Sequence, residues 1–180
     1  NSMVGTVDEN LDNYRIPEAA RALQEFVDEM SNWYVRRGRE RYWVQGLPED
    51  KIAAYMTLYT ALVTTAKAAA PMIPFMAESI YQNLVRSVDA DAPESVHLCD
   101  FPTVNTAAID KELESNMDKV LEIVVLGRAA RNGSSLKNRQ PLAAMYVKLD
   151  GTLDAFYTDI IRDELNVKKV VFTNEVDDLV

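Results

Sequence analysis

The chain has 180 residues, 48% hydrophobic and 26% charged, which is typical of a globular protein with one domain and a small appendage. The formal net charge of −9 argues against a general nucleic-acid binder, because such proteins are usually basic. Cys99 is the only cysteine, so an internal disulfide is excluded and a cytoplasmic location is expected. The first residues show no secretory signal, and Lys67, Pro71 and Pro74 interrupt the longest apolar stretch, so no membrane span is expected.

The first third of the chain predicts two helices. A short apolar pattern before residue 12 is followed by a long helix that begins near Pro17 and reaches about Trp43, where Gly46 and Pro48 end it. Gly38 lies inside this helix and weakens its last turns by about 1 kcal/mol relative to alanine. Apolar residues spaced by three and four predict its buried stripe: Ile16, Ala20, Leu23, Val27, Met30 and Tyr34.

Three further segments continue the helical pattern. A second long helix opens at residues 48–50, and its alanines at 66–70 allow a neighbouring helix to approach closely. Its expected buried face is Ile52, Met56, Tyr59, Val63 and Ala66. A third helix starts at Pro74, and residues 88–107 form an acidic connector. A fourth helix ends at Asn132-Gly133, with an inward face of Ile109, Leu113, Met117, Val120, Val124 and Gly127.

The last forty residues predict a different kind of structure. Met145 to Leu149 and Val167 to Thr173 are typical of strands, and Thr152 to Leu165 of a helix between them, which implies a parallel pair. Two strands alone are marginally stable, so we expect this subdomain to be truncated. The fold class is therefore mainly α, with a helical domain at residues 1–140 and a small β-α-β subdomain at 141–180.

No catalytic or metal-binding pattern is present in the sequence. The six glycines form no phosphate-binding loop, and the single histidine, His97, cannot build a catalytic triad. His97 and Cys99 provide too few ligands for a zinc site, so both are interpreted as surface or packing residues. Scattered carboxylates would permit a glycosidase-like pair, but they lie mainly on polar helix faces or in the acidic connector. The chain is predicted to be non-catalytic, without cofactor or metal.

Two basic segments stand out against the acidic background, and the first lies at residues 32–43 with a local charge of +3. On a helix, Asn32, Arg36, Arg39 and Trp43 recur on one narrow face about 16 Å long. Guanidinium planes bind phosphates and stack on bases, and an indole offers a stacking surface, so this stripe suits unstacked RNA bases. The alternative is a solvated face of arginines with buried tryptophans. Trp33 points away from the stripe and is expected to be structural.

The second basic segment covers residues 123–149 and carries a local charge of +5 with no acidic residue. Arg128 and Arg131 lie near a helix C-terminus, where the dipole alone accounts for a cation. That reason does not account for Lys137 and Arg139, which lie beyond the helix and are the second pair of candidate RNA-binding residues.

Several runs resemble one family in order along the chain. They are LDNYRIPEAARALQEF (11–26), MSNWYVRR (30–37), APMIPFMAE (70–78), GRAARN (127–132), KNRQPL (137–142) and ELNVK (164–168). Together they resemble the helical domain that follows the catalytic core of isoleucyl-tRNA synthetases, and the NWYVRR run favours this family over its valyl, leucyl and methionyl relatives. One departure is Asn138, where the family pattern has valine.

The resemblance implies a module that binds the anticodon stem and loop of isoleucine tRNA within a class I tRNA ligase using ATP and magnesium. Neither nucleotide-binding signature of that family is present here, nor is its editing domain. The expected partners are the tRNA and the rest of the synthetase chain, with a monomer as the expected state. Two alternatives stay open: the same module from a sister synthetase (valyl or leucyl), and a helical protein-interaction module, which the acidic balance favours.

Overall fold

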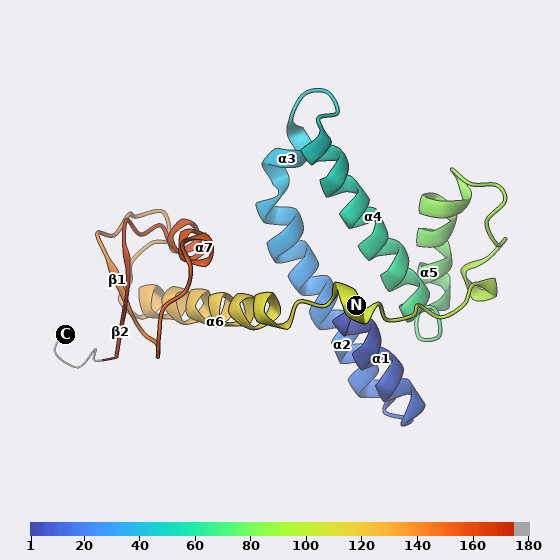
Figure 1. Ribbon diagram of the computed structural model, residues 1–180, viewed down its shortest axis with the longest axis horizontal. Helices are drawn as coiled ribbons and strands as arrows, with labels where there is room; N and C mark the ends of the chain where they lie inside the picture. Colours follow the sequence, from blue (N-terminus) through green and yellow to red (C-terminus); the bar gives the residue numbers. More distant parts are fainter. Residues whose placement is uncertain (175–180) are drawn as a thin grey trace. The chain divides into compact units, whose positions relative to one another are not determined.

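The computed structural model describes residues 1–174 and divides the chain into two compact units, which meet between Ile109 and Asp110. The first unit contains α1 (Ser2–Asp12), α2 (Ile16–Glu29), η1 (Met30–Val35), α3 (Arg39–Trp43), α4 (Glu49–Ala69), α5 (Pro74–Tyr81), η2 (Gln82–Arg86), η3 (Val96–Leu98) and η4 (Thr106–Ala108). The second contains α6 (Lys111–Gly133), β1 (Met145–Lys148), α7 (Ala155–Leu165) and β2 (Val170–Thr173) (Figure 1). The mainly α fold class is confirmed. Within residues 1–174, no helix is both long and apolar enough to cross a membrane.

Small side chains bring three helices together at the centre of the first unit. The buried cluster consists of Val7 of α1, Ala19 and Leu23 of α2, and Ala68 and Ala69 of α4. Alanine lets helix backbones approach closely while still removing apolar surface from water. The close approach predicted for the alanine-rich end of α4 is therefore confirmed.

In the other half of α4, the face that the sequence predicts to be buried is exposed, so that prediction is wrong there. Ile52 and Met56 are exposed, and the buried residue in this half is Ala54. In α2, Ile16 and Val27 are likewise exposed. In this half, α4 is contacted at Ala54 and Tyr55, by Tyr34 and Tyr42, and the side chains of Ile52 and Met56 stay uncovered. Periodicity identifies an apolar face but does not say whether a neighbour covers it.

Tyrosine side chains hold the segment from η1 to α3 against the first half of α4. The Tyr34 hydroxyl donates to the carbonyl oxygen of Ala54 at 3.2 Å, and the rings of Tyr42 and Tyr55 meet edge to face at 5.1 Å. Burial beside these groups raises the pKa of Tyr42 to about 12, so its hydroxyl stays protonated at neutral pH. The segment from η1 to α3 is thus fixed against the first half of α4.

A carboxylate fastens the acidic connector to α5. Glu78 accepts hydrogen bonds from the Ser95 hydroxyl at 2.8 Å, the Val96 amide at 2.9 Å and the Gln82 side chain at 2.7 Å. These donors, Ser95 foremost, lower the pKa of Glu78. Tyr81 adds a bond of 2.9 Å from its hydroxyl to the Pro93 carbonyl. His97 is exposed and Cys99 is half-buried against this cluster, consistent with their expected surface and packing roles.

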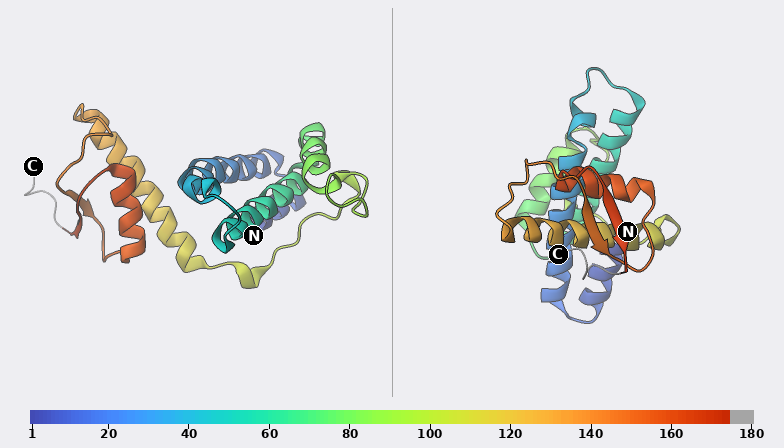
Figure 2. Two further views of the ribbon diagram at one scale, coloured as in Figure 1. Left: turned by 90° about the horizontal axis from the view of Figure 1, so that it is seen from above. Right: turned by 90° about the vertical axis from the view of Figure 1, so that its left-hand side faces the viewer.

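The second unit is built on α6, whose buried residues are Val120, Ile123, Val124, Gly127 and Arg131. Figure 2 shows α7 lying alongside this helix. The strands β1 and β2 pair in parallel, with Met145 opposite Val170, as the β-α-β pattern predicted. Leu113, expected on the inward face, is exposed.

The predicted domains, with a boundary at 140/141, place α6 with the earlier helices, and that division stays a prediction. The compact units of the structure place α6 with the strands and α7, since they divide the chain at 109/110. The physical reason is that Gly127 lets Leu165 of α7 approach so closely that an added Cβ would lie 2.5 Å from its Cδ1 atom. The apolar face of α6 is therefore covered by α7 and β1 within the second unit. The end of the predicted subdomain, residues 175–180, lies outside the described residues.

Candidate nucleic-acid interface

The first basic surface consists of Asn32, Arg36, Arg39 and Trp43, and all four side chains are exposed. The predicted continuous helix carries them, but it is interrupted twice, by the wide turn of η1 and by a turn at Gly38. Single-turn π-helical segments are rare and occur frequently at functional sites. The four side chains consequently form two pairs, Asn32 with Arg36 before Gly38 and Arg39 with Trp43 after it.

Each pair has a defined contact. The Nε of Arg36 donates to the carbonyl oxygen of Asn32 at 2.7 Å, and its guanidinium lies 5.9 Å from the centre of the Trp33 ring. The Arg39 guanidinium lies 4.8 Å from the centre of the Trp43 ring, which is 72% exposed. A cation over an exposed indole gives a flat surface with positive charge, which is suited to stacking on a base beside a phosphate. Trp33 is half-buried, in line with a mainly structural role.

Steric crowding by the backbone of Tyr34 favours glycine at position 38. A Cβ at this position would lie 2.8 Å from the carbonyl oxygen of Tyr34, closer than real Cβ atoms approach backbone. The Gly38 amide donates to that same carbonyl at 2.9 Å. The turn between Arg36 and Arg39 therefore depends on the missing side chain.

The loop after Trp43 is tied to α4 by two cations. Arg41 makes a forked pair with Asp50, at 2.8 Å from Nε to Oδ2 and 2.7 Å from Nη2 to Oδ1. The bond lowers the pKa of Asp50 and raises that of Arg41. Lys51 donates to the Val44 carbonyl at 2.8 Å. Arg41 is thus paired with a residue of α4 at the surface, and the loop that follows Trp43 is tied to the start of α4.

The second basic surface consists of Lys137 and Arg139, both exposed on the loop that follows α6. The amide of Gln140 donates to the carbonyl of Lys137 at 2.9 Å, so residues 137–140 form a tight turn with Asn138 and Arg139 at its centre. This turn places the two candidate cations close together along the chain and at the surface.

The two arginines that precede this loop are structural. Arg128 pairs at 2.6 Å with Glu164, whose side chain is only 5% exposed. Arg131 is the one charged or polar residue buried among those described, with 4% exposure. It donates to the carbonyl oxygens of Lys137 and Gln140 at 3.0 Å each, and to those of Leu165 and Asn166 at 2.6 and 3.2 Å.

Sequence reasoning missed this role of Arg131. The dipole of α6 accounts for a cation in its last turn, but it does not predict that the side chain turns inward to four carbonyls. The only signal in the sequence is that three separate runs, GRAARN, KNRQPL and ELNVK, share the resemblance; the structure brings them together around Arg131.

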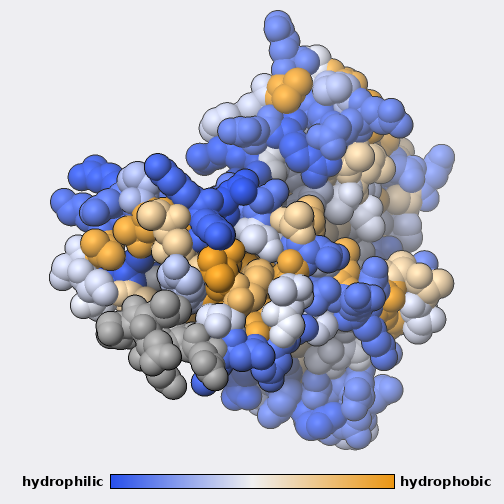
Figure 3. All heavy atoms as spheres, turned by 60° about the vertical axis from the view of Figure 1, so that its left-hand side comes forward, coloured by the Kyte–Doolittle hydropathy of each residue, from blue (hydrophilic) through white to orange (hydrophobic). Residues whose placement is uncertain are grey.

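The structure refines the charge pattern that the sequence suggested. Arg41, Arg128 and Arg131 have partners within the chain, and the side chains of Arg36, Arg39, Lys137 and Arg139 are exposed. On the face shown in Figure 3, hydrophilic residues cover much of the surface, and apolar residues reach it in small groups. The cations of both basic surfaces are therefore accessible to a polyanion in spite of the net charge of −9.

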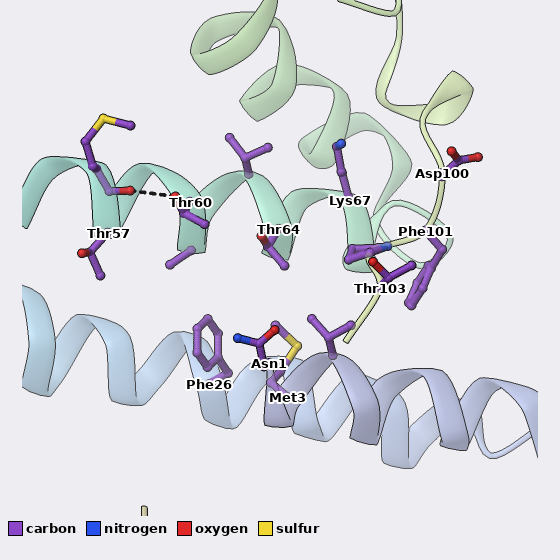
Figure 4. A pocket seen from close by; sticks show the side chains of 15 residues that line it. Asn1, Met3, Phe26, Thr57, Thr60, Thr64, Lys67, Asp100, Phe101 and Thr103 are labelled. Carbon is purple, nitrogen blue, oxygen red and sulfur yellow. Dashed lines mark hydrogen bonds between the residues drawn. The ribbon is translucent and has the colours of Figure 1, made fainter. Parts of the chain in front are cut away.

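An open groove with a volume of about 870 Å³ lies in the first unit, between α4 on one side and α1 and α2 on the other. Figure 4 shows Thr57, Thr60 and Thr64 of α4 on one wall and Phe26 with Met3 on the other. The hydroxyls of Thr57 and Thr60 donate to backbone carbonyls of their own helix at 2.8 Å. These hydroxyls are thus used locally.

Among residues 1–174, no three histidine, cysteine, aspartate or glutamate side chains are grouped to hold a metal ion. What the described residues do offer is two exposed cationic surfaces, one of them carrying an exposed indole. Such groups bind phosphates and unstacked bases by charge and stacking, and they require no chemistry of bond breaking.

Comparison with known proteins also favours a module that binds nucleic acid. Residues 1–147 match the family described as the anticodon-binding domain of tRNA ligase. The chain is 57% identical to the isoleucine–tRNA ligase of Clostridium novyi and 52% identical to that of Clostridium tetani, in each case over 96% of this chain and 16% of the relative. It is 46% identical to the isoleucine–tRNA ligase of Dehalococcoides mccartyi, over 95% of this chain and 17% of the relative. The chain thus spans about a sixth of the length of these curated relatives.

Proposed function

The chain belongs to the anticodon-binding domain family of tRNA ligases, and from this premise we propose that it binds the anticodon stem and loop of isoleucine tRNA through its two basic surfaces. The observation that carries the proposal is the stacked pair of Arg39 and exposed Trp43, which combines a phosphate ligand with a stacking surface. In this proposal Asn32 and Arg36 extend the first basic surface, and Lys137 and Arg139 bind the RNA backbone.

The wider proposal concerns the longer protein of which this chain represents a part. That protein joins isoleucine to its tRNA with ATP and magnesium, acts as a monomer in the cytoplasm, and uses this chain to position the tRNA. In this proposal ATP and magnesium bind to other parts of that longer protein.

Fluorescence anisotropy with labelled tRNA transcripts tests the proposal directly. We expect the chain to bind isoleucine tRNA with a dissociation constant on the order of 10⁻⁴ to 10⁻⁶ M at physiological salt, because few phosphate contacts are available and the net charge opposes them. Valine and leucine tRNAs serve as comparisons: a preference for one of them would assign the module to a sister synthetase. Displacement by a small acidic protein with no preference among tRNAs would instead support a protein-interaction module.

A further inference from the structure

The turn at residues 137–140 is held from beneath by a buried cation. The Nη1 atom of Arg131 donates to the carbonyl oxygens at the two ends of the turn, those of Lys137 and Gln140, at 3.0 Å each. A planar guanidinium presents its donors in a fixed fork, so two simultaneous bonds fix the distance between the two acceptors. Arg131 thus reinforces from below the turn that the Gln140 amide closes onto the Lys137 carbonyl.

The other side of the same guanidinium fixes where the turn sits. Its Nη2 atom donates to the carbonyls of Leu165 and Asn166, where α7 ends. Asn166 adopts the left-handed conformation with φ of 49°, and its side-chain amide donates to the Asn138 carbonyl at 3.3 Å. The turn is thus joined to the end of α7 by two routes, through Arg131 and through Asn166.

Burial makes this arrangement costly to disturb. A guanidinium stays charged at every physiological pH, and removing it from water is unfavourable unless its donors are satisfied. Arg131 meets that condition with four carbonyl oxygens. Because the carbonyls at both ends of the turn face inward, the side chains of Lys137 and Arg139 are presented outward.

From these contacts we infer that Arg131 is a positioning residue that preforms the Lys137–Gln140 turn as a binding site for RNA backbone phosphate. The ligand class is a phosphodiester, bound by Lys137 and Arg139. Arg131 itself does not touch the RNA. The inference rests on the proposed function, since it assigns a part of that binding to a preordered turn.

The test is a double-mutant cycle on the chain with isoleucine tRNA, using Arg131→Lys against the pair Lys137→Ala and Arg139→Ala. Lysine keeps the charge of Arg131 but loses the fork. We expect Arg131→Lys alone to weaken binding about threefold to tenfold, and the alanine pair to cost much less in its presence than in the parent. Additive effects, or no effect of Arg131→Lys, would overturn the inference.

A direct measurement of order keeps the test independent of RNA. In ¹⁵N relaxation, the amides of Asn138 and Arg139 should become more mobile in Arg131→Lys while those of Val124 and Ile161 in the core stay unchanged. Should Arg131→Lys unfold the unit, Asn166→Gly replaces it, because glycine tolerates the positive φ and removes only the bond to Asn138. This variant should loosen the turn and weaken binding to a smaller degree. An equally rigid turn with unchanged binding would refute the assignment.

The controls separate this inference from the proposed function. Arg162→Met removes a half-exposed cation of α7 that pairs with Asp159 at 3.0 Å, and it should leave the order of the turn unchanged. A parent chain that binds no tRNA would refute the proposed function. A parent that binds tRNA but is indifferent to loss of Lys137 and Arg139 would refute the inference alone, leaving binding to the first basic surface.

Discussion

The Arg39 guanidinium lies 4.8 Å from the centre of the Trp43 ring, and this contact joins the two kinds of group that bind single-stranded RNA. One face of the indole is covered by the cation, while the ring as a whole stays 72% exposed. A base can therefore stack on the uncovered part while the guanidinium keeps its N–H groups for phosphate. The two side chains should act as a unit, and their replacements should be non-additive.

Replacing Trp43 should affect RNA binding, whereas replacing Trp33 should affect the stability of the fold. Trp43→Ala should weaken tRNA binding by about 1–3 kcal/mol through lost stacking, with little change in the salt dependence. Trp33→Ala should instead lower the free energy of unfolding, because that ring is half-buried and packs under Arg36. Urea unfolding and anisotropy on both variants distinguish them, with Trp43→Phe as the control that keeps an aromatic plane. Equal losses of binding in Trp33→Ala and Trp43→Ala would contradict this division.

Gly127→Ala should destabilise the second unit. Alanine gains about 1 kcal/mol of helix propensity, but its Cβ would lie 2.5 Å from Cδ1 of the buried Leu165, and overpacking of this kind costs about 1–3 kcal/mol. The matched control is Gly133→Ala at the end of the same helix, where nothing lies within 4 Å of an added Cβ. That variant should be neutral or slightly stabilising. If α7 can shift freely away from α6, urea unfolding would instead show Gly127→Ala to be at least as stable as Gly133→Ala.

Much of the helical and strand pattern follows from local rules, as the alanine-rich end of α4 and the parallel pair of β1 and β2 illustrate. What local rules do not contain is the identity of each neighbour. The expected face of α4 at Ile52 and Met56 is exposed because the neighbouring segment contacts Ala54 and Tyr55 instead. Likewise, α6 has an apolar face in the sequence, but periodicity did not show that Leu165 of α7 packs against it at Gly127.

The candidate site was predicted in part for similar reasons. Charge and exposure along a helix identify Arg36, Arg39 and Trp43 as accessible groups, since these are properties of one continuous segment. The role of Arg131 depends on carbonyl oxygens from two other segments. Every residue type carries a backbone carbonyl, so the sequence does not reveal which carbonyls accept these bonds. Neither the wide turn of η1 nor the break at Gly38 follows from side-chain periodicity.

Acid should release the connector from α5. The hydrogen bonds to Glu78 lower its pKa in the folded protein below the ordinary value, so they stabilise the fold above that ordinary value. This contribution is lost as the pH falls through the folded pKa, because a protonated carboxyl no longer accepts the Ser95 and Val96 donors equally well. Glu78→Gln should therefore be less stable than the parent at pH 7, with a difference that shrinks in acid. The control is Glu25→Gln at an exposed site of α2, and a pH-independent difference for Glu78→Gln would exclude the linkage.

The chain alone should not activate isoleucine. It has no phosphate-binding loop, and residues 1–174 hold no cluster of metal ligands, so isoleucine-dependent exchange of pyrophosphate into ATP should stay at background. A full-length isoleucine–tRNA ligase measured in parallel provides the positive control. Exchange above background by the pure chain would show that it contains a catalytic site of its own.

The first basic surface should control the salt dependence of binding. If Arg36, Arg39, Lys137 and Arg139 each neutralise one phosphate, log affinity should fall with log salt at a slope of about −3, given about −0.7 per contact on single strands and about −0.9 on duplex. Replacing Arg36 and Arg39 by alanine should make that slope shallower by about 1.4–1.8. Stability should change by less than about 0.5 kcal/mol per exposed site.

The matched control for that double variant is the pair Arg15→Ala and Arg21→Ala, since it removes the same charge from the same unit. Both of these arginines are exposed and pair only weakly, with Glu9 at 3.5 Å and Glu18 at 3.8 Å. A change of net charge alone would alter both double variants alike, whereas phosphate contacts at Arg36 and Arg39 would alter only the first. If the two slopes agree with each other and with the parent, the first basic surface is a solvated face and RNA binding has to depend on Lys137 and Arg139.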